Sequence, residues 1–210
     1  ALHYGGVTFL NNIDLKFMFK DTECVRMQSG KYSCVIAPKL GASVLRLRDE
    51  ENGIEVFRYR DDCTLKTINK AREIWGLPTL FLPNRFDKGI IKTSDAVYQM
   101  PVNEKKLDNF IHGWVHKREH EIECYSTQDK KVVLVTSYTF DKNDEMYSYF
   151  PVDFKISYTF TLSENGLLQE IYLTNNSDKA LPVSICTHTC LNAPMCDLSL
   201  IHISEPTRHS

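Results

Sequence analysis

The amino-acid sequence predicts an all-β domain built from antiparallel strands. Most of the chain consists of short runs in which β-branched and aromatic residues alternate with polar ones. Turn-forming residues separate these runs, and only one stretch has the apolar spacing that a helix requires. At 210 residues the chain is long enough for one domain with a sizeable core.

The N-terminal third is expected to hold five strands in succession. Ser29-Gly30-Lys31 and Glu51-Asn52-Gly53 are expected to be turns, because Gly and Asn tolerate a positive φ. Such short connections favour antiparallel pairing of neighbouring strands. The expected strands are Leu15–Phe19, Cys24–Met27, Tyr32–Ala37, Val44–Leu47 and Ile54–Tyr59.

The next segment, Asp62–Ile74, is expected to form one short helix. Its apolar residues Leu65 and Ile68 have helical spacing, and Asp61 or Asp62 would be the N-cap. Residues 75–83 follow, with two prolines among mostly apolar side chains, and are expected to form a buried connecting segment.

The rest of the chain again predicts strands. Asn165-Gly166 lies between two of them and is a strong signal for a hairpin turn. The strands are expected at Val97–Met100, Glu119–Tyr125, Val132–Phe140, Phe154–Leu162, Leu167–Thr174 and Pro182–His188.

Composition excludes several classes of protein. Lys plus Arg number 25 and Asp plus Glu 27, so the net charge of −2 offers no surface for nucleic acid. The seven cysteines are scattered without a Cys-x-x-Cys pair, which predicts reduced thiols in a cytoplasmic protein. No apolar run approaches the ~20 residues that span a bilayer, and no signal peptide is visible, so we expect no membrane partner.

The C-terminal residues are treated separately. Residues 198–208 resemble the translation of an adapter used in DNA sequencing. We therefore expect residues 1–197 to be the N-terminal portion of a single domain and residues 198–210 to be a non-native tail; the alternative is a genuine polar tail.

Three groups of residues could carry chemistry. Asn84 and Arg85 follow an apolar run, and a guanidinium suits paired sugar hydroxyls or a carboxylate. The alternative is an arginine that only ends a strand.

The second group is His112-Gly113 among Phe110, Ile111 and Trp114, where burial would make the histidine pKa adjustable. The alternative is a core histidine bonded to a backbone carbonyl. His116 and His120 would make a metal-binding stripe on a helix, but the flanking sequence favours a strand.

The third group, Cys186, His188 and Cys190, lies at the end of an expected strand. Such close spacing along a strand rarely gives a tetrahedral zinc site, so no metal is expected, although a zinc protein stays an alternative. No phosphate-binding or dinucleotide-binding glycine motif is present, and no cofactor is expected.

Together these segments resemble the aldose 1-epimerase (galactose mutarotase-like) family. The resemblance is carried, in order, by residues 75–85, by Ile111-His112-Gly113, by Phe150-Pro151 leading into residues 153–162, and by residues 182–194. It implies an antiparallel β-supersandwich, incomplete in this chain, and an isomerase that interconverts the α and β anomers of a free hexose without a cofactor. Its partner is a small sugar; the oligomeric state stays open.

The resemblance also implies roles for four residues. Arg85 would bind sugar hydroxyls with Asn84 beside it, His112 would contact the sugar near its ring oxygen, and His188 would be the general acid. The family's general base, a glutamate, would lie beyond Asp197. This chain departs from the family at Phe86, Thr187 and Thr189, which leaves the preferred sugar open.

Two alternatives remain on the same fold. One is a hexose-6-phosphate epimerase, for which Lys88, Lys117 and Arg118 could supply positive charge. The other is a non-catalytic carbohydrate-binding or regulatory module, because a fold does not fix a function.

We expect the isolated chain to be inactive and poorly stable, because the general base and part of the sheet would be missing. Polarimetry of sugar anomers measures this activity. Turnover well above the spontaneous rate would contradict the expectation.

Overall fold

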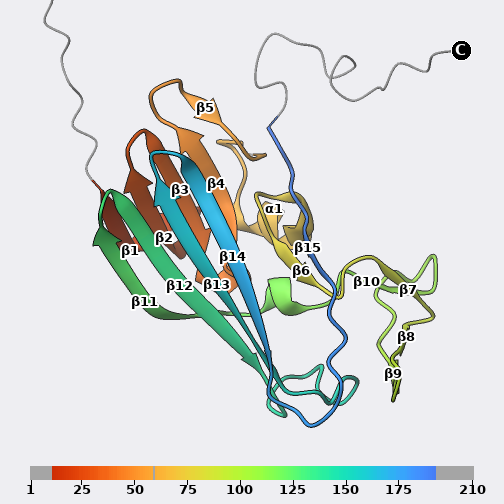
Figure 1. Ribbon diagram of the computed structural model, residues 1–210. Coiled ribbons are helices and arrows are strands. Elements are labelled where there is room, and N and C mark those ends of the chain that lie inside the picture. The colour runs from red at the N-terminus through yellow and green to blue at the C-terminus, as the bar shows by residue number, and fades with distance from the viewer. Residues whose placement is uncertain (1–10, 59, 193–210) are drawn as a thin grey trace, which may run out of the picture.

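Two antiparallel sheets pack face to face in the computed structural model, which describes residues 11–58 and 60–192 (Figure 1). The five strands of the first sheet are hydrogen-bonded in chain order. They are β1 (Asn12–Phe19), β2 (Thr22–Ser29), β3 (Tyr32–Ala37), β4 (Ser43–Asp49) and β5 (Ile54–Glu55).

The second sheet is also ordered along the chain. Its strands are β11 (Glu121–Gln128), β12 (Lys131–Phe140), β13 (Phe154–Ser163) and β14 (Gly166–Asn175). The expected hairpin is confirmed, since Ser163 pairs with Gly166, whose φ of +110° suits a residue without Cβ. The antiparallel all-β fold class is therefore confirmed.

Three two-stranded ladders lie beside the two sheets (Figure 1). They pair β6 (Thr79–Phe81) with β15 (Ile185–Thr187), β7 (Arg85–Asp87) with β10 (Asn109–Ile111), and β8 (Ile90–Lys92) with β9 (Val97–Gln99). The short helical elements are α1 (Leu65–Lys70) and the 3-10 turns η1 (Pro38–Leu40), η2 (Arg72–Ile74) and η3 (Val115–Lys117).

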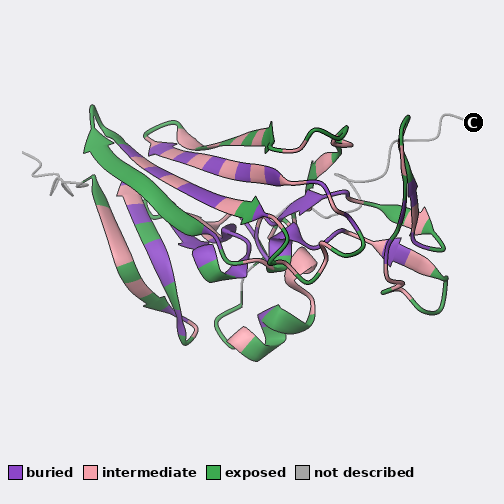
Figure 2. Cartoon of the chain, turned by 90° about the horizontal axis from the view of Figure 1, so that it is seen from below, coloured by how far each residue is buried: buried purple, intermediate pink, exposed green. Residues whose placement is uncertain are grey.

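The core lies between the two sheets and extends under β6. Along β13 the residues from Phe154 to Leu162 alternate between buried and half-buried, as a strand with one face on the core requires (Figure 2). The ring of Phe81 packs on Phe154 at 4.8 Å and on Trp114 at 6.1 Å between centroids. Because Phe81 belongs to β6, aromatic packing fixes this strand to the core.

The expected helix differs from the observed one. Asp62–Ile74 is not a single helix, because the chain leaves helical geometry at Ala71 (φ −154°, ψ 67°) between α1 and η2. The N-cap is Thr64, whose hydroxyl accepts a hydrogen bond from the backbone N–H of Thr67 at 3.2 Å. Asp62 is instead paired with the guanidinium of Arg60.

The structure also corrects two expectations around β6 and η3. The segment 75–83 is buried as expected, but it contains the strand β6. His116 lies in the 3-10 turn η3, not in a strand, and His120 precedes β11. Both histidines have only 2% of their surface exposed, so they belong to the core.

No helix among the described residues is long and apolar enough to cross a bilayer. The six cysteines in this part of the chain are free thiols.

His120 is expected to make the fold sensitive to acid. Its ring stacks on Tyr158 at 4.7 Å, and neither ring nitrogen has a hydrogen-bond partner in the described part of the chain. Burial lowers the pKa of His120 to about 3. The unfolded chain takes up this proton below its ordinary pKa of ~6.5, so acid stabilises the unfolded state between these two values.

His120→Phe removes this proton-binding group and keeps a flat ring on Tyr158. We expect its unfolding free energy, relative to the unaltered chain, to rise as the pH falls from 7.5 to 4.5. Urea unfolding at several pH values measures the difference. A difference that stays constant across this range would contradict the prediction.

Candidate active site

Strand β6 organises the candidate site, because its residues contact the two segments that carry the histidines. Cys186 of β15 pairs with Leu80 of β6, and the N–H of His188 donates to the carbonyl of Pro78 at 3.0 Å. Beyond β6 the chain continues into Asn84, whose carbonyl accepts the N–H of His112 at 3.0 Å. The segments of His112 and His188, which are more than 70 residues apart in sequence, thus meet at residues 78–84.

The two imidazoles lie next to each other. Their ring centroids are 5.3 Å apart and the planes meet at 78°. On each ring Nδ1 is buried and has no hydrogen-bond partner among the described residues. The Nε2 atom of each ring is not among these buried, unpartnered atoms.

The backbone around this pair is strained. Leu82, Asn84 and His112 all have a positive φ, of +59°, +72° and +67°. Such conformations cost about 1–3 kcal/mol each in residues other than glycine, and they gather at functional sites.

Gly113 is required next to His112. A Cβ atom at this position would lie 1.8 Å from the carbonyl oxygen of Phe81. Only glycine allows this close approach, so the His-Gly pair holds the histidine against β6.

Arg85 lies at the start of β7, where it pairs in register with Ile111 of β10. Its guanidinium binds the carboxylate of Glu104 through Nε at 2.8 Å and Nη2 at 2.9 Å. Half of the side chain, 50%, stays exposed. No hydrogen bond joins Arg85 to either histidine in the described part of the chain, so it lies beside the pair and not in it. Asn84, the residue directly before β7, is exposed.

Several charges act on His112. Burial is the main cause that lowers its pKa, and the positive charges of His188 and Arg85 add to this effect. The carboxylates of Glu73 and Glu104 act in the opposite direction. His112 therefore stays neutral at a lower pH than an ordinary histidine would.

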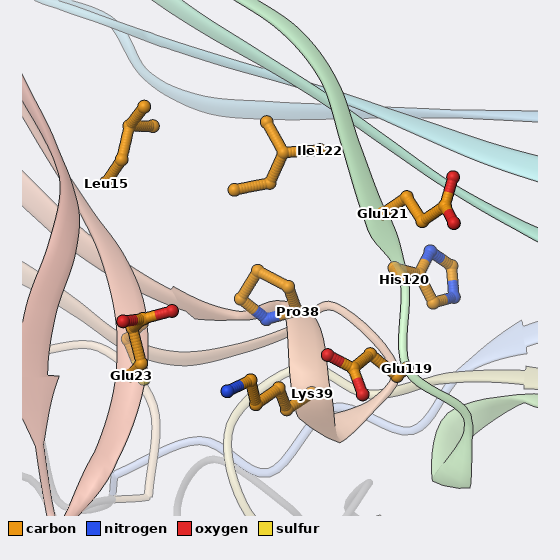
Figure 3. A pocket seen from close by; sticks show the side chains of 9 residues that line it. Leu15, Glu23, Pro38, Lys39, Glu119, His120, Glu121 and Ile122 are labelled. Atoms are coloured by element: carbon orange, nitrogen blue, oxygen red, sulfur yellow. The ribbon is translucent and has the colours of Figure 1, made fainter.

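A hollow of about 550 Å³ lies elsewhere, between the edges of the two sheets. Figure 3 shows Ile122 reaching from β11 across it toward Leu15 of β1. None of the four predicted site residues lines this hollow. We place the site at His112 and His188 because unpartnered ring nitrogens and residues with a positive φ coincide there.

The cysteines around His188 do not assemble a metal site. Among the described residues no three side chains of His, Cys, Asp or Glu are grouped so that they could hold a metal ion. The zinc alternative with Cys186 and Cys190 therefore finds no support in this part of the chain.

Sequence reasoning missed three residues near the site, namely Asn103, Glu104 and Glu73. Asn103 and Glu104 lie in an irregular loop with no motif of its own, and Glu73 lies in the segment that was expected to be helix. Only the pairing of β7 with β10 shows that this loop lies next to Arg85.

The chain matches known proteins in sequence and in structure. The family model for aldose 1-epimerase matches residues 23–206, a range that includes part of the expected non-native tail. The boundary of that tail lies outside the described residues. A galactose mutarotase-like protein from Clostridium acetobutylicum is similar at 29% identity and a TM-score of 0.84, over 89% of this chain and 56% of that one.

Two further solved structures share the fold. Galactose 1-epimerase from Lactobacillus acidophilus has 16% identity and a TM-score of 0.64, over 87% of this chain and 53% of its own. A galactose mutarotase-like protein from Lactobacillus casei has 18% identity and a TM-score of 0.57, over 77% and 47%.

This chain thus spans about half the length of the solved structures that it matches. The family model covers most of its residues, in agreement with the β-sandwich described above. The chain belongs to the aldose 1-epimerase family.

Proposed function

We propose that this chain carries the sugar-binding and acid-donating side of an aldose 1-epimerase active site that acts on a free hexose. The observation that carries the proposal is the contact between His112 and His188, with ring centroids 5.3 Å apart and Arg85 on the neighbouring strand. Two imidazoles and a guanidinium suit the ring oxygen and hydroxyl groups of a pyranose.

Six free thiols among the described residues also support the expected cytoplasmic location.

The reaction needs two proton transfers. Protonated His188 gives its proton to the ring oxygen while a base removes the proton of the anomeric hydroxyl. The bond between C1 and the ring oxygen breaks, and its electron pair stays on the oxygen. The open aldehyde then rotates about C1–C2, and the reverse transfers close the ring on the other face of C1. The base, a glutamate by family resemblance, is expected outside the described residues.

The lowered pKa of His112 suits a different role from that of His188. The positive charge of His188 is one of its causes, so a proton on His188 disfavours a second proton on His112. Neutral His112 can then hydrogen-bond the sugar near its ring oxygen without competing as an acid.

The two alternatives are a hexose-6-phosphate epimerase and a non-catalytic sugar-binding module, and the structure bears on them differently. For a hexose 6-phosphate, Arg118 is a poor anchor, because its guanidinium already binds Asp144 at 2.5 and 2.8 Å. Lys88 and Lys117 are exposed, and among the described residues no hydrogen bond or ion pair joins either lysine to His112 or His188. A non-catalytic sugar-binding module fits the same geometry, and turnover distinguishes it from an enzyme.

We expect His188→Ala to lower kcat by a factor on the order of 10²–10⁴, because general acid catalysis is lost. The measurement is polarimetry of α-galactose in a protein that carries this chain at full family length. If the variant keeps full activity, His188 has no part in the mechanism.

We expect Arg85→Ala to raise KM for galactose far more than it lowers kcat, because hydrogen bonds to hydroxyl groups away from C1 are lost. Arg60→Ala is the matched control, since Arg60 is also an exposed arginine with one carboxylate partner. Equal effects of the two substitutions would contradict a binding role for Arg85.

A further inference from the structure

Asn103 lies in the loop between β9 and β10 and holds the backbone directly before His112. Its Oδ1 accepts the N–H of Ile111 at 2.7 Å, and its Nδ2 donates to the carbonyl of the same residue at 3.0 Å. That carbonyl belongs to the peptide group that joins Ile111 to His112. One amide side chain therefore fixes the peptide from which the strained His112 backbone departs.

Glu104, the next residue, holds Arg85. Its Oε2 accepts from Arg85 Nε at 2.8 Å and from Asn109 Nδ2 at 2.9 Å, and its Oε1 accepts from Arg85 Nη2 at 2.9 Å. Asn109 lies in β10, so the carboxylate is fixed from a second strand. Adjacent residues of one loop thus restrain both His112 and Arg85.

The pairing leaves part of the guanidinium available. An arginine has five N–H donors, and a planar fork can bind on two edges. Glu104 takes the edge formed by Nε and Nη2, and no described residue bonds to Nη1. The edge formed by Nη1 and Nη2 can therefore donate to two adjacent hydroxyl oxygens.

We propose that Asn103 and Glu104 are positioning residues of the sugar site, which hold His112 and Arg85 in register for the same ligand. This inference rests on the proposed function of that site. Glu104 holds the Nε–Nη2 edge of Arg85, and Asn103 holds the backbone of Ile111 directly before His112. Neither residue has to touch the sugar.

An ordinary surface ion pair is the competing explanation, and the chain contains a matched example. Arg60 and Asp62 also form a two-point pair, at 2.9 and 2.7 Å, and both are exposed. Within residues 11–58 and 60–192, no hydrogen bond joins that pair to a histidine. The Arg60–Asp62 pair therefore serves as the control for an exposed arginine–carboxylate pair without a positioning role.

The charges give a readout that does not depend on activity. His112 is affected by Arg85 and His188, which lower its pKa, and by Glu73 and Glu104, which raise it. Glu104→Gln removes one raising charge and leaves the cation of Arg85 in place. The His112 pKa therefore falls in this variant.

The experiment compares Glu104→Gln and Asn103→Ala with the control Asp62→Asn in a protein that carries this chain at the full length of its family. NMR follows the His112 imidazole through a pH titration, the Arg85 Nε–H signal, and chemical shifts during titration with galactose. In Glu104→Gln we expect a lower His112 pKa, a shifted Arg85 signal and galactose affinity weaker by about two- to fivefold, the range of one exposed charge pair. Asn103→Ala shifts the His112 signals and weakens galactose binding. Asp62→Asn changes none of these.

Two results count against the inference in different ways. If the unaltered protein binds galactose, and Glu104→Gln and Asn103→Ala bind it with the same affinity as the unaltered protein, the positioning role is overturned. The proposed function then stands. If the unaltered full-length protein shows no galactose-dependent shifts at His112 or His188, the proposed function fails and the positioning role fails with it.

Discussion

The candidate site depends on the short pairing between β6 and β15. Leu80 pairs with Cys186, and this contact brings His188 beside the stretch that ends at Asn84. The pairing is three residues long and is held by packing below it, because Phe81 is buried against Phe154 and Trp114. The aromatic core therefore sets the position of β6, and β6 sets the position of both histidines.

The strain around the histidines is a consequence of the same arrangement. His112 has a positive φ at the point where its N–H bonds to the carbonyl of Asn84 and where Gly113 leaves no room for a Cβ beside the carbonyl of Phe81. Tertiary contacts stabilise this conformation, which the isolated peptide would avoid. Two imidazoles at this separation, with ring nitrogens that lack partners among the described residues, are suited to binding a hydrogen-bonding ligand.

Much of the fold follows from the sequence, because alternation and turn residues act locally. Tyr32–Ala37 was predicted with its observed bounds, and Asn165-Gly166 with its hairpin. The helix was predicted too long, since Thr64 caps it later and Ala71 ends it. Arg85, His112 and His188 were named from family resemblance, and their roles stay predictions. Glu104 could not be found, because its partnership with Arg85 exists only once β7 pairs with β10.

The most direct test of this account is the distance between the two rings. A NOESY spectrum of the folded chain with labelled histidine reports contacts between the imidazole C–H protons of His112 and His188. The observed centroid separation of 5.3 Å predicts a cross-peak between them, which His188→Gln would remove. A well-dispersed spectrum without that cross-peak would contradict the claim that β6 brings the two histidines together.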